Sequence, residues 1–444
     1  MQGNLVYRLS DKPPLWISIL SAFQWFIFTL ASSLVVPVVI GHAFGFSQME
    51  TAALVQRTFL FVGLASFLQV TFGHRYPIME GPAGMWWGIF LILLNLAPTL
   101  GKTPLEIGQN LEMGLLVTGF VIIILGITRT ISKIQKWFTP IVTGTYMILL
   151  AISMSGSFIG GMLGIGYHGD QIKWVLSLLS VFLIGFVIYL SSHRNPIFRS
   201  FSILIGIAVG WGIYAWLGLV DTPIASRSIF TAPDLFAFGT PKFDLGITLT
   251  SLLTGFILIS NLITSVAVMG DASLEQPNEK TFNQGGIFTG VAHMLSGIGA
   301  TIGLVPLAIA AGMVKTTGNA SRISFIISTF FMMSLGFFPA IGLFFSVLPA
   351  PVGYAVLFTT YAQLLSFGLK DYEKIPLNPR NLAVIGISLM IGVGTMFIPQ
   401  EALAGIHPIF SYLLGNGLIL GVLISLLLEH IIYRKQAKQE GSEP

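Results

Sequence analysis

Two carboxylates and one imidazole stand out in a chain whose apolar stretches hold few ionisable side chains. Glu80 lies where one apolar stretch begins, Asp271 lies where another ends, and His293 lies within a third. A charged side chain at the centre of a bilayer costs roughly 2.5–3.5 kcal/mol on insertion scales, so such groups are few and have a reason to be kept. We expect Glu80 and Asp271 either to bind a proton or cation or to contact water at an interface. We expect His293 to form a hydrogen bond between helices.

A second polar feature follows one face of a later apolar stretch. Ser260, Asn261, Thr264 and Ser265 have spacings of one, three and four residues, which places most of them on one side of a helix. Such a face can bind a neighbouring helix or the hydrogen-bonding edge of a heterocycle. Gln24 is a further lone polar residue, between two aromatic ones.

Two apolar segments are interrupted by glycine and proline. The segment 302–312 contains Gly303, Pro306 and Gly312, and the segment 75–84 breaks the first half of the chain in the same way. Backbone that leaves helical geometry within a membrane must line a cavity or be buried in protein, because lipid cannot satisfy its polar groups. A pair of such breaks in corresponding halves indicates the binding site of a transporter. The alternative is that each break is a kink used only for packing.

The composition is that of an integral membrane protein. Of 444 residues, 54% are hydrophobic and 9% are charged, and the mean hydropathy is +0.84. The net charge of +4 comes from short basic clusters between apolar runs, which orient a membrane protein and do not indicate nucleic-acid binding. The chain has no cysteine, which excludes disulfides and thiolate metal sites.

Apolar runs long enough to cross a bilayer, about 20 residues each, recur about fourteen times. We number them as spans 1 to 14, near 16–40, 52–72, 81–97, 112–128, 139–163, 172–192, 200–219, 245–270, 287–303, 304–316, 322–348, 350–369, 381–398 and 408–433. With the N-terminus in the cytoplasm, the Lys and Arg clusters fall in every second loop, as the positive-inside rule requires. We therefore predict one membrane transporter domain over 1–444, multi-pass in the cell membrane. Both termini are expected in the cytoplasm, with residues 434–444 as a cytoplasmic tail.

A polar, proline-rich segment at about 220–244 divides the spans into two sets of seven. An odd number of spans per half forces the second half to enter the membrane the other way up, so we predict an inverted repeat. The first repeat covers about 16–219 and the second about 245–433. Overlaying Pro77 on Pro306 gives an offset of 229 residues between the two breaks.

Enzymatic motifs are missing from the sequence. It contains no His-Glu-x-x-His, no Gly-x-Ser-x-Gly and no phosphate-binding loop with its Lys. We therefore expect a carrier or facilitator that is not an enzyme, is not driven by ATP within this chain, and has no cofactor and no metal site.

Several motifs resemble the nucleobase–ascorbate transporters, also called nucleobase:cation symporter-2, which include bacterial uracil, xanthine and purine permeases. The resemblance covers nearly the whole chain. It is carried by Leu20–Trp25 with Pro37, Tyr76–Pro82, Gly290, Gly297, Gly299, Gly312 followed by Thr317–Arg322, and Leu348–Gly353.

The resemblance implies an all-α membrane protein of about 14 transmembrane helices in a 7+7 inverted repeat. Spans 1–4 and 8–11 would form a core and spans 5–7 and 12–14 a gate, with short strand-like breaks in spans 3 and 10. It also implies a symporter, commonly a homodimer, that takes up a purine such as xanthine, urate or a related base by alternating access. The default coupling ion would be the proton.

At several positions this chain departs from the family pattern. The family's Glu in the eighth span, which grips the base, falls on Asn261, and its His or Asp four residues later falls on Ser265. Its Gln or Glu and the following Asn in the tenth span fall on Ile309 and Ala310. The aromatic expected in the third span falls on Gly84. Glu80 is then the carboxylate near these positions that could couple transport to an ion, and Asp271 is a second candidate. The substrate-binding positions expected from the resemblance and the residues are Gln24, Gly84, Asn261, Ser265, Ala308, Ile309 and Ala310.

Two other functions remain open at this point. An anion transporter of the related sulfate and bicarbonate carrier fold would have a neutral eighth span and would capture anions with helix ends. The other is a facilitator or channel without coupling, or a membrane scaffold that transports nothing. A channel or scaffold would show no saturable uptake and no ligand-induced stabilisation.

Overall fold

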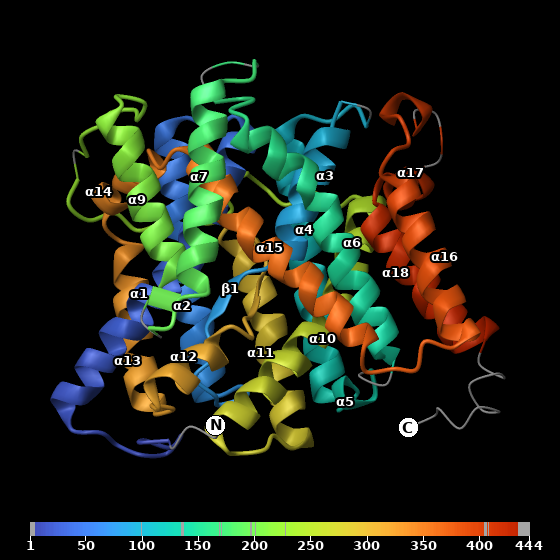
Figure 1. The fold of residues 1–444 in the computed structure, drawn as a ribbon, viewed down its shortest axis with the longest axis horizontal. Helices are drawn as coiled ribbons and strands as arrows, with labels where there is room; N and C mark the ends of the chain where they lie inside the picture. Colours follow the sequence, from blue (N-terminus) through green and yellow to red (C-terminus); the bar gives the residue numbers. More distant parts are fainter. Residues whose placement is uncertain are drawn as a thin grey trace.

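The computed structural model describes residues 5–98, 100–134, 137–167, 169, 171–195, 198–199, 201–226, 228–403, 406 and 408–433. The predicted tail 434–444 lies outside these residues. The chain is mostly helical, and its helices pack side by side around the short strand β1 near the middle of the molecule (Figure 1). The helices before the linker are α1 (Leu15–Phe44), α2 (Gln48–Thr71), α3 (Gly84–Leu96), α4 (Pro104–Ile127), α5 (Ile131–Ile134), α6 (Pro140–Met162), α7 (Trp174–Ser191) and α9 (Ser202–Trp216).

The second half repeats the order of two long helices followed by a short strand. Its helices are α10 (Leu245–Ser273), α11 (Glu279–Ile298), α12 (Ala310–Thr317), α13 (Arg322–Leu335), α14 (Pro339–Ser346), α15 (Ala350–Tyr372), α16 (Pro379–Thr395), η2 (Gln400–Leu403), α17 (Pro408–Gly415), α18 (Gly417–Leu427) and η3 (Leu428–Ile432). The start of α1 and the end of η3 lie toward the same, lower side of the view in Figure 1. An even number of membrane crossings would have this result.

Within the described ranges, seven helices are long and apolar enough to cross a membrane, or eight if the bent pair α13 and α14 counts as one span. Four shorter apolar helical segments accompany them: Gly84–Leu96, Ser202–Trp216, Pro379–Thr395 and Gly417–Ile432. The sequence predicts one span over 322–348. The structure divides this segment into α13 and α14, which meet at an angle of 83° around Gly336 and together can form one bent span.

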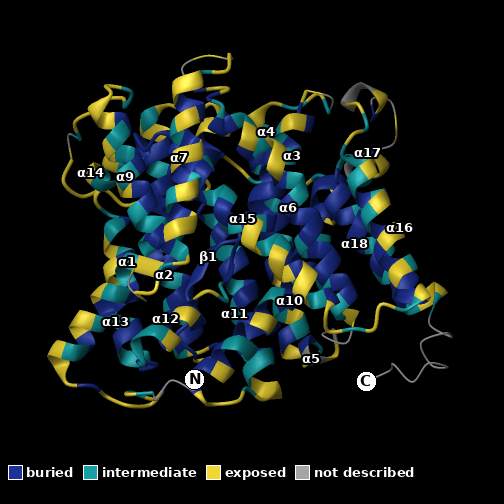
Figure 2. Cartoon of the chain, viewed as in Figure 1, coloured by how far each residue is buried: buried dark blue, intermediate teal, exposed yellow. Residues whose placement is uncertain are grey.

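Large apolar side chains on the outside of the bundle show where lipid would lie. Leu178, Val181 and Phe182 of α7 are all exposed, and exposed residues alternate with buried ones along α7 and α16 in Figure 2. A soluble protein seldom exposes a continuous apolar surface of this kind. The exposed face of α7 is therefore the one that a bilayer would cover.

Helices α4 and α11 approach each other closely through glycine. A Cβ added to Gly119 of α4 would meet the carbonyl oxygen of Gly290 of α11, and a Cβ on Gly290 would meet that of Gly119. Small residues let two membrane helices bring their backbones together, where dispersion forces and weak hydrogen bonds hold them. This contact joins the first half of the chain to the second.

The linker 220–244 packs onto the start of α4. Its described residues form no helix or strand, and Gln109 and Asn110 of α4 donate hydrogen bonds of 2.9 Å to the carbonyl oxygens of Phe238 and Lys242. Asp244 then caps α10, since its carboxylate accepts a hydrogen bond of 2.9 Å from the backbone N–H of Ile247.

The two predicted breaks become a pair of strands. β1 (Glu80–Pro82) and β2 (Leu304–Pro306) lie antiparallel, with Glu80 opposite Pro306 and Pro82 opposite Leu304. Where the helices are interrupted, backbone N–H and C=O groups lose their helical hydrogen bonds. The pairing of the strands provides new hydrogen bonds, which lipid could not supply. Pro82 and Pro306 end their strands 224 residues apart. The overlay of Pro77 on Pro306 is therefore five residues out of register.

Candidate functional site

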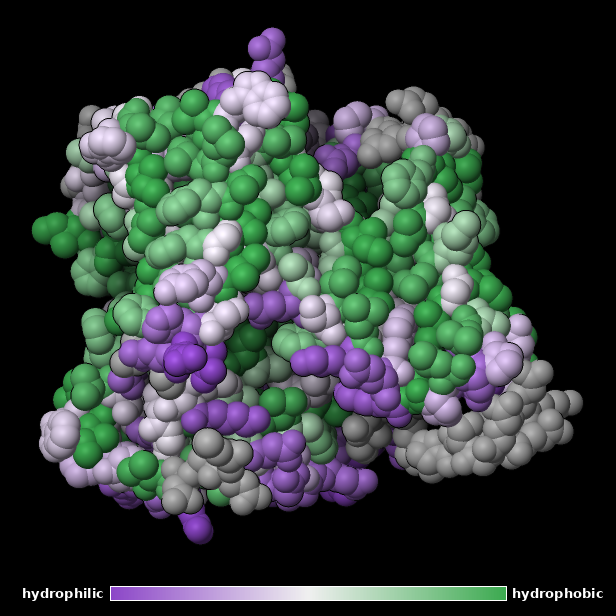
Figure 3. All heavy atoms as spheres, in the orientation of Figure 1, coloured by the Kyte–Doolittle hydropathy of each residue, from purple (hydrophilic) through white to green (hydrophobic). Residues whose placement is uncertain are grey.

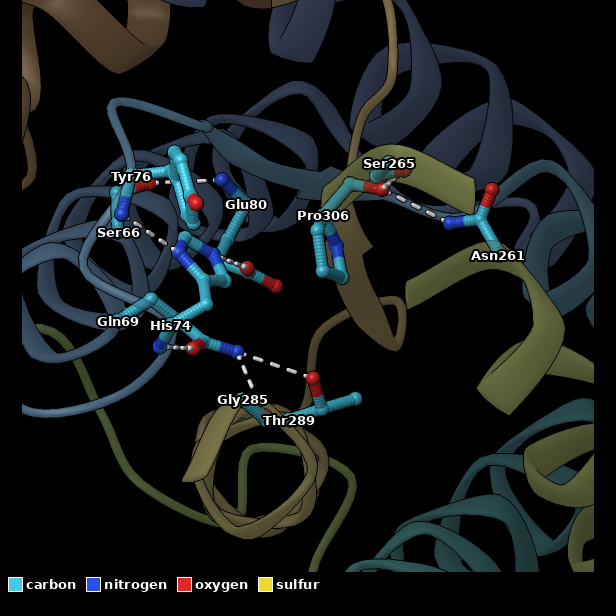
Figure 4. Close-up of polar contacts among 10 residues, drawn as sticks. All are labelled: Ser66, Gln69, His74, Tyr76, Glu80, Asn261, Ser265, Gly285, Thr289 and Pro306. Carbon is cyan, nitrogen blue, oxygen red and sulfur yellow. Dashed lines mark hydrogen bonds and ion pairs between the residues drawn. The ribbon is translucent and has the colours of Figure 1, made fainter. Parts of the chain in front are cut away.

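The end of β2 is held by two side chains from α10. The carbonyl oxygen of Pro306 accepts hydrogen bonds from the Asn261 side-chain amide at 2.8 Å and from the Ser265 hydroxyl at 2.9 Å (Figure 4). The chain leaves strand geometry after Pro306, so this buried carbonyl needs hydrogen-bond donors from another element. The polar face of α10 thus binds the break itself. Asn261 keeps its side-chain oxygen, which accepts no hydrogen bond from the residues that the structure describes.

Glu80 lies directly across the strand pair from Pro306 and is fully buried. Its backbone N–H donates to the hydroxyl of Ser66 at 2.9 Å. Neither carboxylate oxygen has a hydrogen-bond partner among the described residues. The imidazole Nε2 of His74 lies 3.9 Å from one of these oxygens (Figure 4). Burying a carboxyl group without partners is costly, so this arrangement needs a functional reason.

His74 is oriented by the backbone and by α2. Its Nδ1 accepts a hydrogen bond of 3.1 Å from the backbone N–H of Tyr76, so a neutral imidazole carries its proton on Nε2, facing Glu80. The side chain of Gln69 accepts from the His74 N–H and donates to the carbonyl of Gly285 and the hydroxyl of Thr289 on α11. The sequence reading missed His74 because it lies just outside the apolar runs.

His293 forms the inter-element hydrogen bond that the sequence predicts. Its Nε2 accepts from the indole N–H of Trp86 at 2.9 Å, and its Nδ1 donates to the carbonyl oxygen of Thr289 at 2.8 Å. Because one nitrogen accepts and the other donates, the ring is a neutral imidazole with its proton on Nδ1. His293 therefore ties α11 to α3 in the structure described here.

A cavity of about 450 Å³, a volume within the usual range for small-molecule sites, lies between the first half of α1 and the end of α12. Gln24 of α1 and Met313 of α12 line it, together with Asn319, whose amide donates to Ser21 at 2.9 Å. The space-filling view shows the molecule hollowed below its centre, where hydrophilic residues border an apolar recess (Figure 3). Gln24 is thus on a wall of a cavity that α12, the helix after the second break, also lines, and Asn261 and Ser265 are not among its lining residues.

The remaining expected site residues follow the two strands. Gly84 begins α3 two residues after β1, and Ala308 and Ile309 lie between β2 and α12. Ile309 is 44% exposed, which is unusual for an isoleucine at the start of a broken span, whereas Ala310 is fully buried. The structure thus brings Gly84, Asn261 and Ser265 to the paired breaks and turns Ala310 inward.

Asp271 lies apart from this cluster. It is exposed near the end of α10, and its carboxylate accepts a hydrogen bond of 3.0 Å from the side chain of Gln276. The described residues contain no group of three His, Asp or Glu side chains that could hold a metal ion.

Two further buried charges escaped the sequence reading. Arg57 of α2 is 4% exposed and Glu112 of α4 is 1% exposed, and Glu112 accepts a hydrogen bond of 3.3 Å from the backbone N–H of Phe238 in the linker. Arg57 lies in the predicted span 52–72, where the cost of a charge in an apolar run is the signal that could have found it.

A mostly helical membrane chain whose two broken segments pair between long helices has the arrangement of a secondary transporter. The chain belongs to a permease family, the Xan_ur_permease or nucleobase–ascorbate transporter family, whose model matches residues 17–401. It is a membrane transporter and not an enzyme. The resemblance stated from the motifs is therefore confirmed.

Relatives in bacteria are similar over nearly their whole length. The chain is 35% identical over 430 residues to YwdJ of Bacillus subtilis, which is named as a purine permease, covering 95% of this chain and 98% of that protein. It is 25% identical to the uric acid permease PucK of Bacillus subtilis, covering 91% and 93% of the two chains. It is 24% identical to the xanthine permease XanP of Escherichia coli, covering 97% and 95%.

Solved structures share the fold at low sequence identity. The transmembrane domain of the cyanobacterial bicarbonate transporter BicA is 14% identical, with a TM-score of 0.59 and coverage of 96% of this chain and 99% of that one. The murine Solute Carrier 26 family member A9 anion transporter, in its inward-facing state, is 11% identical, with a TM-score of 0.63 and coverage of 96% and 70%. These likenesses concern the fold alone.

Proposed function

We propose that this chain is a permease for a purine base such as xanthine or urate, which it takes up together with protons. The observation that carries the proposal is the pairing of β1 with β2, which brings Glu80, Asn261 and Ser265 to one place. The names of the bacterial relatives support a purine as the substrate.

The chemistry of the site suits the hydrogen-bonding edge of a purine. Asn261 offers a side-chain oxygen as acceptor, and the start of α3 at Gly84 offers backbone N–H groups, since Ala83 provides no side-chain cap. A purine presents ring N–H donors and carbonyl or ring-nitrogen acceptors on one edge, which these groups match. Asn261 stays neutral throughout the cycle, so charge changes must occur at another residue.

We assign the charge change to Glu80. Its buried carboxyl group and the facing Nε2 of His74 can share one proton, while neither has another hydrogen-bond partner among the described residues. A group that must gain and lose a proton during transport is best left without fixed partners. Asp271, the other candidate carboxylate, is exposed and hydrogen-bonded to Gln276, so we place coupling at Glu80.

The transport cycle that we propose rests on an inverted repeat of two times seven spans, residues 16–219 and 245–433. Spans 1–4 and 8–11 form the core that contains both strands, and the other spans form the gate. Movement of the core against the gate gives alternating access. Both termini lie in the cytoplasm of a cell-membrane homodimer in this proposal.

Ligand-induced stabilisation tests the substrate class. A ligand that binds the folded protein raises its melting temperature by mass action. Purified protein is heated with xanthine, urate, uracil, ascorbate, sulfate or bicarbonate. The proposal expects the largest increase with a purine. An increase with sulfate or bicarbonate and none with any base would overturn it in favour of anion transport.

A further inference from the structure

The residues before α1 are fastened to the loop between α12 and α13. In the segment 5–11, which we call the N-terminal strap, the backbone N–H of Tyr7 donates a hydrogen bond of 3.2 Å to the carbonyl oxygen of Gly318. The carbonyl oxygen of Tyr7 accepts one of 2.9 Å from the N–H of Ala320. Tyr7 and Asn319 thus lie opposite each other as in a parallel sheet. Figure 1 shows the dark blue strap along the lower edge of the molecule, beneath α12 and α13.

Side chains strengthen this attachment. Leu9 is 1% exposed and belongs to the same apolar cluster as Val314 of α12 and Phe325 of α13. The hydroxyl of Ser321 donates a hydrogen bond of 2.8 Å to the carbonyl oxygen of Asp11. Because backbone pairing, apolar burial and a side-chain hydrogen bond all hold it, the strap must move together with α12 and α13.

Two side chains of the strap line the cavity of about 450 Å³. Val6 is exposed and Tyr7 is half-buried. Asn195 and Phe201, which lie between α7 and α9, line the same cavity. In the proposed division of the spans, the strap, α1 and α12 belong to the core, whereas α7 and α9 belong to the gate. The cavity therefore lies between the two bodies that are proposed to move.

The cavity extends from the strap toward the second break. Along α1 its lining residues run from Ile17 to Gln24, a distance of about 10 Å at the rise of an α-helix. Along α12 they run back from Thr317 to Met313, three residues after this helix begins at Ala310. The strap lies at the outer end of this route, because it pairs with the chain directly after α12. With the N-terminus in the cytoplasm, as proposed, this end is the cytoplasmic one.

We infer that the N-terminal strap closes the cytoplasmic end of the cavity, and that Tyr7 does so by contacting Asn195 and Phe201 when the binding site faces the outside. Two packed bodies that hinge or slide against each other open and close the cleft between them. Since the strap is fixed to the core, any approach of the core to the gate narrows the space in front of Tyr7. The inference rests on the proposed transport function and deepens it by naming the residues that seal one side.

The three side chains suit a contact that forms and breaks in every cycle. The phenol of Tyr7 and the ring of Phe201 can meet edge to face, which is a favoured aromatic arrangement. The Tyr7 hydroxyl and the Asn195 amide can each donate and accept a hydrogen bond. None of these groups carries a charge, so closing the cavity over them buries no ion. Attachment of the strap alone would not need an aromatic residue that lines the cavity.

Disulfide cross-linking tests the closure, because the chain contains no cysteine of its own. The test pair is Tyr7→Cys with Asn195→Cys. A disulfide requires Cα atoms within about 7 Å of each other, so a cross-link shows that the strap has met the gate. We expect oxidation to cross-link this pair and to abolish uptake of the base. A reducing agent should restore uptake, and uptake by the reduced variant shows that it is folded.

Two matched pairs control for the chemistry and for the direction of the side chain. Tyr7→Cys with Asn319→Cys joins the strap to the loop that it already pairs with, so this pair should cross-link, and its oxidised and reduced forms should take up the base at the same rate. Arg8→Cys with Asn195→Cys uses the next residue, which is exposed and does not line the cavity, and it should not cross-link. Comparing the oxidised and reduced forms of one variant removes the effect of the substitutions themselves.

The results separate this inference from the proposed function. The inference is wrong if positions 7 and 195 do not cross-link under conditions that cross-link positions 7 and 319. A cross-link between 7 and 195 that leaves uptake unchanged would also overturn it, because the strap would then not close the route. If the wild type takes up no purine, the proposed function fails, whereas cross-linking, which is read on a gel without substrate, still decides whether the strap meets the gate.

Discussion

Removing the two donors from the Pro306 carbonyl should destabilise the protein more than the sum of the single changes. Asn261→Leu and Ser265→Ala each leave this carbonyl one of its two hydrogen bonds, of 2.8 and 2.9 Å. Each single loss should cost about 1 kcal/mol, the net value of one hydrogen bond. The double variant leaves the buried carbonyl without either donor, which adds a desolvation penalty of about 1–3 kcal/mol.

The free energy of unfolding in detergent, followed by tryptophan fluorescence, gives the coupling between the two positions as a double-mutant cycle. We expect a coupling of about 1 kcal/mol or more. Ser260→Ala is the control, because among the described residues its hydroxyl bonds the Ile257 carbonyl of the same helix alone, and it should be additive with Asn261→Leu. Additive effects at Asn261 and Ser265 would refute the idea that these side chains together hold the break.

Two other substitutions test the coupling residue and the close packing of the second break. Glu80→Gln should abolish gradient-driven accumulation of the base while sparing exchange, because glutamine cannot change its charge. Asp271→Asn, at the exposed end of α10, is the control and should keep both accumulation and exchange. Full accumulation by Glu80→Gln in reconstituted vesicles would contradict the assignment. Gly303→Ala should lower the stability of the fold by about 1–3 kcal/mol through overpacking, because its methyl group would overlap the Trp86 ring. Gly312→Ala has open space around its Cβ and should leave the melting temperature unchanged. Equal losses of melting temperature in the two variants would contradict the packing argument.

The breaks were visible in the sequence because their residues violate a local rule. Glycine and proline in an apolar span signal non-helical backbone, so the segments 75–84 and 302–312 could be located within a few residues. Their pairing register could not be read, because Glu80 meets Pro306 only through tertiary contacts. The 83° bend between α13 and α14 was missed, although Gly336 and Pro339 at this junction carry the same glycine and proline signal.

Side chains at the site were harder to predict than the backbone. The polar face with Asn261 and Ser265 was recognised, but its use in holding the Pro306 carbonyl depends on how α10 packs against β2. His74 carries no sequence signal of its own. It gains interest only because its Nε2 faces the Glu80 carboxylate.

Uptake by purified protein in proteoliposomes tests the central claim most directly. Vesicles with an alkaline interior are compared with vesicles at equal pH on both sides, using labelled xanthine and urate. We predict that the imposed proton gradient drives accumulation of one of these purines above its outside concentration, and that equal pH allows equilibration only. Accumulation of sulfate or bicarbonate without purine uptake, or purine flux that ignores the gradient, would contradict proton-coupled purine transport.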